Sequence, residues 1–264
     1  MVTGYILLQA AALVAAPDSG ADIASLLPGT FSNEEQVYFE KDAGRPAPPW
    51  LSLRISPDQD RLVMEPIDAF GKLIGKADPV VVSTGDRRSA VQVGKCSRFF
   101  ERSEQGWLYA AAQNRMACRQ TYQIIAIARD GIRLRLDDGT ETFLKRARPA
   151  RCWAAIPRTQ VKEDGSTDWV FARDLELHDQ GGRVTAGGGD SGAEPVTLRM
   201  RAVHWPAPST NRPSLVLYVH KQDPDRAESY SWADIDARRV GLNLRWMQAS
   251  CTIDDRQGSG KSSD

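Results

Sequence analysis

The sequence carries no excess of charge of either sign and no long apolar run. Lys plus Arg number 34 and Asp plus Glu number 34 in 264 residues, so the net charge is zero. A cationic nucleic-acid binder or a polybasic membrane protein is therefore not expected. No apolar run reaches the length of about 18 residues that indicates a transmembrane helix. These absences favour an ordinary globular protein.

The loops of two common enzyme classes are also missing. The sequence contains neither a Gly-x-Ser-x-Gly elbow nor a Gly-x-x-x-x-Gly-Lys phosphate loop. A hydrolase would need a nucleophile and a base in one cleft, and no such pair can be nominated from the residues. Composition and motifs thus leave open whether the protein is an enzyme.

Four cysteines are present, and none forms a Cys-x-x-Cys pair. They are Cys96, Cys118, Cys152 and Cys251. An even number suits disulfide bonds in an oxidising compartment, and we favour the pairs Cys96–Cys118 and Cys152–Cys251. The alternative is four buried free thiols.

Residues 1–20 are a candidate signal peptide. An apolar stretch, residues 6–16, is followed by small residues. No Lys or Arg precedes this stretch, and Pro17 follows the Val14-Ala15-Ala16 cleavage site. The alternative is an ordinary buried helix. With the cysteine count, the segment favours a periplasmic or secreted protein.

From Trp50 onward the hydrophobic pattern has the period of two that is typical of strands. We predict a mainly β protein, with an antiparallel barrel in residues 21–148, a second, smaller β unit in 149–253 and a disordered tail in 254–264; one merged sheet system is the alternative. The predicted strands are 50–55, 61–65, 79–83, 90–93, 107–112, 121–128, 132–136, 142–145, 169–177, 196–203, 214–220 and 242–247.

Three segments are predicted without strands. Residues 147–168 are rich in Arg, Pro and polar residues and suggest a connection between the two β units. Residues 181–192 contain six glycines and suggest a mobile loop, and residues 233–239 suggest a short helix.

Near the N-terminus, Ser32 and Glu35 fit a capping box that predicts a helix through about Glu40.

The segment Leu27-Pro28-Gly29-Thr30-Phe31-Ser32-Asn33-Glu34-Glu35-Gln36 resembles the start of the CpeT/CpcT family. That family opens with Gly-x-Phe-Ser-Asn-x-Glu-Gln on a first helix, and residues 50–55 stand in the place of its following strand. Cys96 and Cys118 look like its paired cysteines around a hairpin. The resemblance covers about residues 24–140, and the C-terminal unit has no counterpart in it.

Family members attach bilin chromophores to phycobiliproteins and adopt a calycin-like barrel. The resemblance thus implies a calycin-like barrel with an internal or mouth cavity for a bilin-like tetrapyrrole or similar apolar ligand. It implies chromophore lyase activity and an acceptor protein as partner. Asn33, Glu35 and Gln36 would contact the ligand, and Arg54 would pair with one of its carboxylates. Residues 68–74 lack the Glu-Gln-Ala element that the family carries after its first strand.

Each of these residues also has a simpler interpretation. Ser32 and Glu35 could serve only to cap a helix, and Arg54 could lie on a solvent-facing side of its strand. Arg199 and Arg201, which alternate along one strand face, carry the same ambiguity. His178, His204 and His220 could hold a metal only if their strands converged, and no local spacing supports a metal site.

Two functional hypotheses follow. The first is an exported CpeT/CpcT-like protein that binds a tetrapyrrole or similar apolar ligand. The second is a non-catalytic periplasmic protein that binds a partner or supports the envelope. A filled barrel with an exposed apolar patch on the second unit would favour the second hypothesis. A homodimer is compatible with either, although no dimer surface is visible in the sequence.

Overall fold

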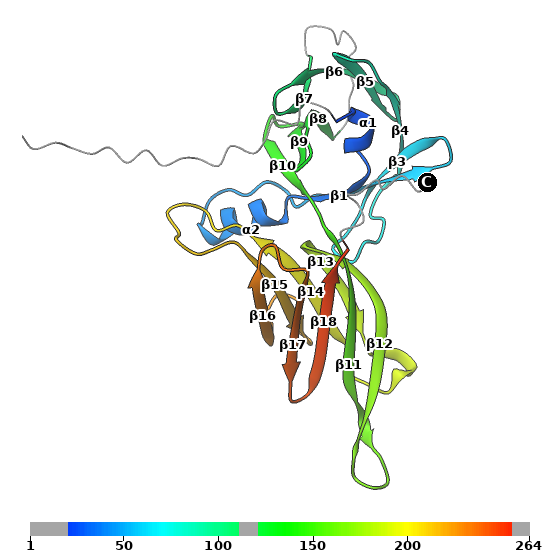
Figure 1. The fold of residues 1–264 in the computed structure, drawn as a ribbon, viewed down its shortest axis with the longest axis vertical. Coiled ribbons are helices and arrows are strands. Elements are labelled where there is room, and N and C mark those ends of the chain that lie inside the picture. The colour runs from blue at the N-terminus through cyan, green and yellow to red at the C-terminus, as the bar shows by residue number, and fades with distance from the viewer. Residues whose placement is uncertain (1–20, 111–120, 255–264) are drawn as a thin grey trace, which may run out of the picture.

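The computed structural model describes residues 21–110 and 121–254. Within them the chain forms a closed ten-stranded antiparallel barrel followed by two four-stranded sheets (Figure 1). The predicted class, a mainly β protein with an antiparallel barrel and a smaller β unit, is confirmed. None of the described helices is long and apolar enough to cross a membrane.

The barrel strands follow one another around the wall in chain order, and β1 closes the wall by pairing with both β2 and β10. The strands are β1 (Gly29–Ser32), β2 (Ser52–Asp58), β3 (Arg61–Pro66), β4 (Asp78–Ser83), β5 (Arg88–Val93), β6 (Cys96–Ser103), β7 (Gly106–Tyr109), β8 (Tyr122–Ile127), β9 (Gly131–Leu136) and β10 (Glu141–Arg146).

Large side chains fill the barrel interior. Phe31, Phe100 and Trp107 are fully buried there, and the short helix α1 (Ile23–Leu26) belongs to the same core. A cavity of about 10 Å³ remains beside Phe100 and other inward side chains. Because one water molecule needs about 10–15 Å³, this space is far too small for an elongated ligand. Large side chains thus occupy the described barrel interior, and this small cavity would not hold the ligand that the resemblance implied.

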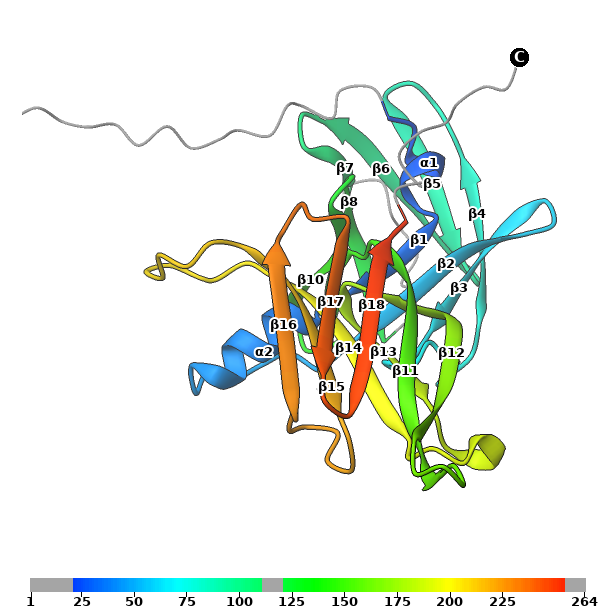
Figure 2. The same cartoon turned by 60° about the horizontal axis from the view of Figure 1, so that its bottom comes forward.

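The second unit is a sandwich whose two sheets share one core (Figure 2). One sheet has the order β12-β11-β18-β17 and the other β13-β14-β15-β16. Their strands are β11 (Pro149–Val161), β12 (Thr167–His178), β13 (Gln180–Ala186), β14 (Val196–Val203), β15 (Ser214–His220), β16 (Ser229–Asp234), β17 (Arg239–Leu244) and β18 (Met247–Ile253).

The predicted connection at residues 147–168 is wrong, because most of it is the central strand β11. Ala150, Cys152, Ala154 and Ile156 alternate toward the core. Three of these side chains are small and stand among Arg and Pro residues, so their period of two gives a weak hydrophobic signal.

Three other predictions in the second unit differ from the structure. Half of the predicted loop at 181–192 is strand β13, which pairs with β14 in spite of its two glycines. The predicted helix at 233–239 is the turn between β16 and β17. The predicted strand at 242–247 spans a hairpin turn, since β17 ends at Leu244 and β18 begins at Met247.

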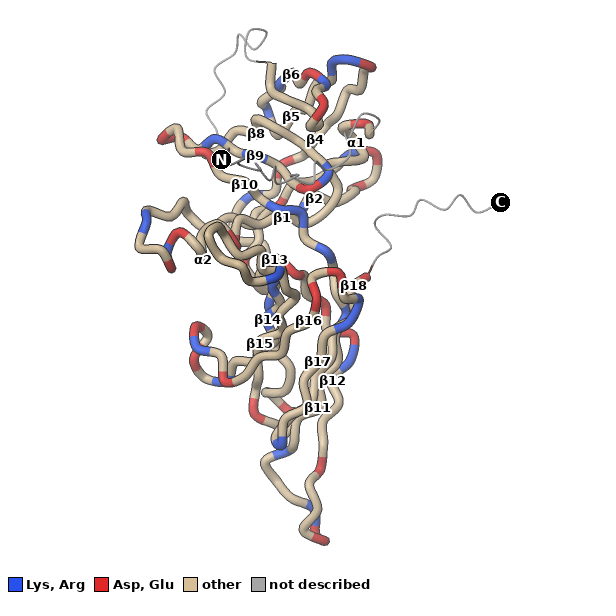
Figure 3. Tube along the Cα trace, turned by 60° about the vertical axis from the view of Figure 1, so that its left-hand side comes forward, with Lys and Arg blue, Asp and Glu red and all other residues tan. Residues whose placement is uncertain are grey.

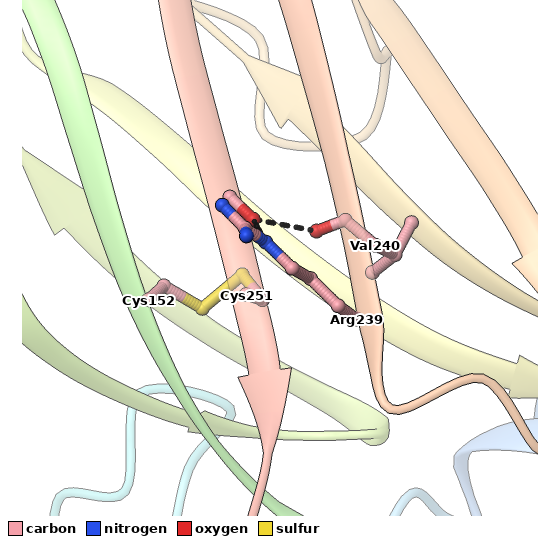
Figure 4. Close-up of a disulfide and its surroundings, with 5 residues drawn as sticks. Cys152, Arg239, Val240 and Cys251 are labelled. Carbon is pink, nitrogen blue, oxygen red and sulfur yellow. Dashed lines mark hydrogen bonds between the residues drawn. A yellow bond between two sulfur atoms is a disulfide. The ribbon is translucent and has the colours of Figure 1, made fainter.

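The predicted disulfide between Cys152 and Cys251 is confirmed. The two cysteines are direct cross-strand partners in β11 and β18, and Arg239 of β17 lies beside them (Figure 4). Cys118, the candidate signal peptide and residues 255–264 of the predicted tail lie outside the described residues, so the Cys96–Cys118 pair remains a prediction.

Candidate functional site

The motif that carried the family resemblance lies at the junction of the two β units. Helix α2 (Glu34–Asp42) follows β1 directly and lies between the barrel and the sandwich (Figure 1). The Ser32 hydroxyl accepts a hydrogen bond from the Glu34 N–H at 3.2 Å. The predicted capping box is nevertheless wrong, because the Glu35 carboxylate turns away to Lys145 and His204.

Asn33 fastens the start of α2 to two other parts of the barrel. Its side-chain nitrogen donates to the Pro49 carbonyl at 2.9 Å and to the Thr142 hydroxyl at 3.0 Å. Its side-chain oxygen accepts from the Leu51 N–H at 2.8 Å. Because the side chain is buried and its amide is well paired, Asn33 joins the segment before β2 to strand β10.

Gln36 continues the attachment to β10 one helical turn further on. Its side-chain oxygen accepts from the Thr142 hydroxyl at 2.9 Å and from the Phe143 N–H at 3.3 Å. Thr142 thus accepts from Asn33 and donates to Gln36, so both amides hold α2 against the same barrel strand.

Glu35 links the barrel to the sandwich. Its carboxylate pairs with Lys145 of β10 and accepts from the backbone N–H of His204, which follows β14. The His204 ring nitrogen Nδ1 lies 3.2 Å from the same carboxylate. Burial alone would raise the pKa of Glu35, but the hydrogen bonds from His204 and Lys145 outweigh it and hold the pKa below its ordinary value of 4.5. Glu35 is therefore an ionised connection between the units.

Glu34 makes a second connection to the same strand of the sandwich. Its carboxylate pairs with Arg199 and lies 3.7 Å from Arg201, both on β14, and it accepts from the Trp50 indole N–H at 2.9 Å. The Arg201 guanidinium lies 3.9 Å from the centre of the Tyr38 ring. Arg199 and Arg201 share a face that α2 covers, with side chains 15% and 4% exposed, rather than facing solvent.

Two successive glycines of β13 allow the close approach at this junction. Gly181 has a φ of +82°, and a Cβ there would come within 2.6 Å of the Glu34 side chain. A Cβ on Gly182 would come within 2.6 Å of the His178 backbone nitrogen. Only glycine fits positions of this kind without displacing a neighbour.

Three of the predicted ligand-binding residues line one pocket. Asn33, Glu35 and Gln36 border a pocket of about 260 Å³ together with Arg133 and Lys145. A second pocket of about 420 Å³ lies between the barrel and the sandwich and shares Phe143 and Lys145 with the first. Blue segments in Figure 3 mark Lys and Arg residues where the chain passes from barrel to sandwich.

Arg54, the fourth predicted residue, is elsewhere. Its neighbours Leu53 and Ile55 point into the barrel core, so Arg54 projects from the outer wall. There it pairs with Glu65 at 2.8 Å and donates to the Gly71 carbonyl at 3.1 Å. Arg54 thus lies on the outer side of its strand, which was the simpler interpretation of this residue.

The histidines have separate environments. His204 contacts Glu35, whereas the His178 ring accepts from the Gln180 N–H at 3.2 Å. Burial lowers the pKa of His178 to about 4, against the opposing effect of Asp179 and Glu34. Across the described ranges, no group of three or more His, Cys, Asp or Glu side chains is placed to hold a metal ion.

Sequence reasoning missed Glu34, Lys145 and His204 as members of this junction. A second acidic residue beside Glu35 was the only local signal, because the Lys, Arg and His partners of the two carboxylates lie more than a hundred residues away. No protein-family model, curated protein or solved structure matches this chain. The resemblance to the CpeT/CpcT family therefore rests on the motif residues alone. In the structure these residues connect α2 to the barrel and the sandwich.

Proposed function

We propose that the protein is a non-catalytic binding protein of the periplasm or extracellular space that contacts a protein partner through its second β unit. One observation carries this proposal: the barrel interior is filled, whereas Tyr230 and Trp232 of the sandwich are 63% and 69% exposed. Exposed aromatic side chains in a cluster are typical of protein interaction sites.

The cluster lies on the outer face of β15 and β16. We call it the β16 surface and define it as Tyr218, Tyr230 and Trp232. Tyr218 and Tyr230 are cross-strand partners with ring centres 6.0 Å apart, and Val216 is the partner of Trp232. The Arg199 guanidinium lies 5.8 Å from the Tyr218 ring. Tyr and Trp are among the residues that contribute most often to the energy of protein interfaces.

The strand that carries the exposed rings supports the proposal further. Among the described strands, β16 pairs only with β15, so its other edge carries no strand pairing. The Cys152–Cys251 disulfide suits an oxidising compartment and supports export.

Site-specific photocrosslinking in the native host tests this function. A photoreactive phenylalanine analogue at position 232 should yield a discrete adduct after irradiation. The matched control places the analogue at Val161, which is 68% exposed at the tip of β11. Equal adducts at both positions, or no adduct at 232, would reject the β16 surface. Recovery of the protein from the cytoplasmic fraction would reject export.

A second candidate function, binding of a bilin-like tetrapyrrole, is favoured by the pocket beside α2. Arg133 and Lys145 line it together with the carboxylates of Glu35 and Glu141. Because Lys145 is already paired with Glu35, Arg133 is the cation with which a bilin carboxylate would pair. The larger pocket at the junction shares Phe143 and Lys145 with this one, so both pockets border the same two side chains outside the barrel.

Titration with biliverdin, followed by visible absorption, tests this candidate. Arg133→Ala should weaken binding by about tenfold, because a charge-assisted pair is lost. The matched control is Arg54→Ala, which removes an exposed arginine of the outer wall and should leave the affinity unchanged. The absence of any spectral change with the wild-type protein would reject tetrapyrrole binding.

A further inference from the structure

A separate groove lies on the other sheet of the sandwich, away from the junction and the β16 surface. It covers the outer face of β12, β11 and β18 and has a volume of about 750 Å³. Small-molecule sites usually occupy about 300–1,000 Å³. The groove therefore has the size of a ligand site, in the part of the chain that the family resemblance does not reach.

Two aromatic side chains form its apolar wall. Cys152 and Ala154 point into the sandwich core, so Trp153 between them faces outward on β11. On β12, Phe171 faces outward and is 62% exposed. Phe171 pairs with Ala155, two residues from Trp153 on the same face, so the two rings occupy neighbouring positions on adjacent strands.

A β-bulge shapes the polar wall. The pairing of β11 with β12 shifts between Cys152 and Ala154, so that two residues of β12, Arg173 and Asp174, stand opposite the single residue Trp153. Asp174 adopts a φ of +53°, which is rare for a residue with a side chain. Its carboxylate lies 3.7 Å from the Arg151 guanidinium, and both side chains remain more than half exposed. Bulges of this kind redirect side chains and are frequent beside binding sites.

The floor of the groove is held rigid. Cys152 lines it, and the disulfide to Cys251 ties β11 to β18 beneath it (Figure 4). Thr252, next to the second cysteine, adds a hydroxyl to the rim. A site whose supporting strands are cross-linked loses little conformational entropy when a ligand binds.

The charges of the lining select the class of ligand. Two guanidinium groups, of Arg151 and Arg173, are balanced by two carboxylates, of Asp174 and Asp254. An anion would meet the carboxylates, and a purely apolar ligand would desolvate the charges without replacing their hydrogen bonds. A neutral molecule with many hydroxyls satisfies both donors and acceptors, and the C–H face of a sugar ring packs on aromatic rings.

We propose that this groove binds a neutral saccharide, with one sugar ring against Trp153 and Phe171. The hydroxyls hydrogen-bond to the guanidinium and carboxylate groups on the opposite wall. This binding is independent of the partner that the β16 surface would contact, because the two sites lie on the outer faces of opposite sheets.

Saturation-transfer NMR on the full chain tests the proposal with maltotriose, cellotriose and chitotriose. Transfer to at least one trisaccharide is expected, and Phe171→Ala should weaken its binding by at least about tenfold. Phe171 is exposed, so this variant should fold, and circular dichroism checks that it does. Trp232→Ala, which removes an equally exposed ring from the other sheet, should bind like the wild type.

Three results would overturn the proposal. The first is no saturation transfer to any of the three trisaccharides. The second is unchanged affinity in a folded Phe171→Ala variant, which would place the sugar elsewhere. The third is binding of a sulfated heparin disaccharide with no binding of the neutral sugars, which would assign the groove to an anion.

Discussion

Two neighbouring carboxylates in the first turn of α2 hold different partners. Glu34 points to the arginines of β14, whereas Glu35 reaches Lys145 in the barrel and His204 beyond β14. Consecutive helical residues project in different directions, so one acidic pair can contact three elements. The same geometry explains why neither carboxylate is left for helix capping.

Replacing the buried carboxylate should destabilise the fold in a pH-dependent way. We expect Glu35→Gln to lower the free energy of unfolding at pH 7 by about 1–3 kcal/mol, because two charge-assisted hydrogen bonds are lost. The pKa of Glu35 is depressed in the folded protein, so its contribution is present above its ordinary pKa of 4.5 and is lost as pH falls through the folded value. Urea unfolding at pH 7 and at pH 3.5 measures both effects.

The matched control is Glu40→Gln on the same helix, where the carboxylate pairs with Arg45 in solvent. This variant should leave stability close to that of the wild type, because solvent screens an exposed ion pair. A Glu35→Gln variant as stable as the wild type at pH 7 would contradict the assigned role of the carboxylate.

His178 should remain neutral well below the usual range for histidine. Its pKa is about 4 in the folded protein, against an ordinary 6.5. As the pH falls, this imidazole is therefore protonated in the unfolded chain at a higher pH than in the folded protein. Stability should therefore fall as pH drops from about 6.5 to about 4, and His178→Gln should remove this part of the acid sensitivity. An NMR titration of the imidazole C–H signals gives the pKa directly, and a midpoint near 6.5 would refute the prediction.

The sequence could identify one side of the junction but not the other. Asn33, Glu35 and Gln36 stand out because they fall in a short recognisable motif. Lys145 lies in β10 and His204 comes directly after β14. The local pattern around them indicates burial and strand period, but it does not indicate a contact with α2. Contacts between residues so distant in sequence depend on how the two β units dock.

At the scale of elements, the period of two identified strands where large apolar residues alternate. The predicted ranges 196–203 and 214–220 coincide with β14 and β15, which are rich in Val, Leu and Met. Strands β11 and β13 were missed because Ala, Cys and Gly occupy their buried positions. Small side chains suffice there because the facing strands contribute the large ones.

Loss of the disulfide between β11 and β18 should weaken the sandwich. We expect the double variant Cys152→Ser, Cys251→Ser to unfold with a free energy lower by about 2–4 kcal/mol, since the bond closes a long loop in the unfolded chain. Denaturant unfolding of both proteins measures the difference. Adding a reductant to the double variant controls for any effect of the other cysteines, and equal stabilities without reductant would contradict the expectation.

At the scale of the whole molecule, α2 and its carboxylates join the barrel to the sandwich, together with a backbone hydrogen bond from Arg183 of β13 to the Ala69 carbonyl. The class of both units followed from the number and spacing of short strands. The sandwich arrangement and the burial of Arg199 and Arg201 at the junction did not follow, because an arginine pattern on a strand is the same whether solvent or a helix covers it.

Removing both carboxylates should separate the unfolding of the two units. The wild-type protein should unfold in urea in one transition, and the double variant Glu34→Ala, Glu35→Ala in two. Tryptophan fluorescence reports mainly the second unit, which contains Trp153, Trp169, Trp205, Trp232 and Trp246, whereas far-ultraviolet circular dichroism reports both units.

Coincident curves by both probes in the wild type and divergent curves in the variant are the expected result. The control is Arg54→Ala, which breaks an ion pair within the barrel wall alone. Coincident curves in the double variant would mean that other contacts couple the units.

Each unit is completed by a strand that comes late in its own stretch of chain. Strand β1 pairs with β10, which lies much later in the chain and closes the barrel. Strand β11 likewise pairs with β18, which completes its sheet. Such a topology has a high contact order, which slows folding because the chain must close long loops before these contacts form. On the ribosome, β1 and β11 would each emerge well before the partners that cover their edges, so the nascent chain depends on protection from aggregation until synthesis has passed residue 253.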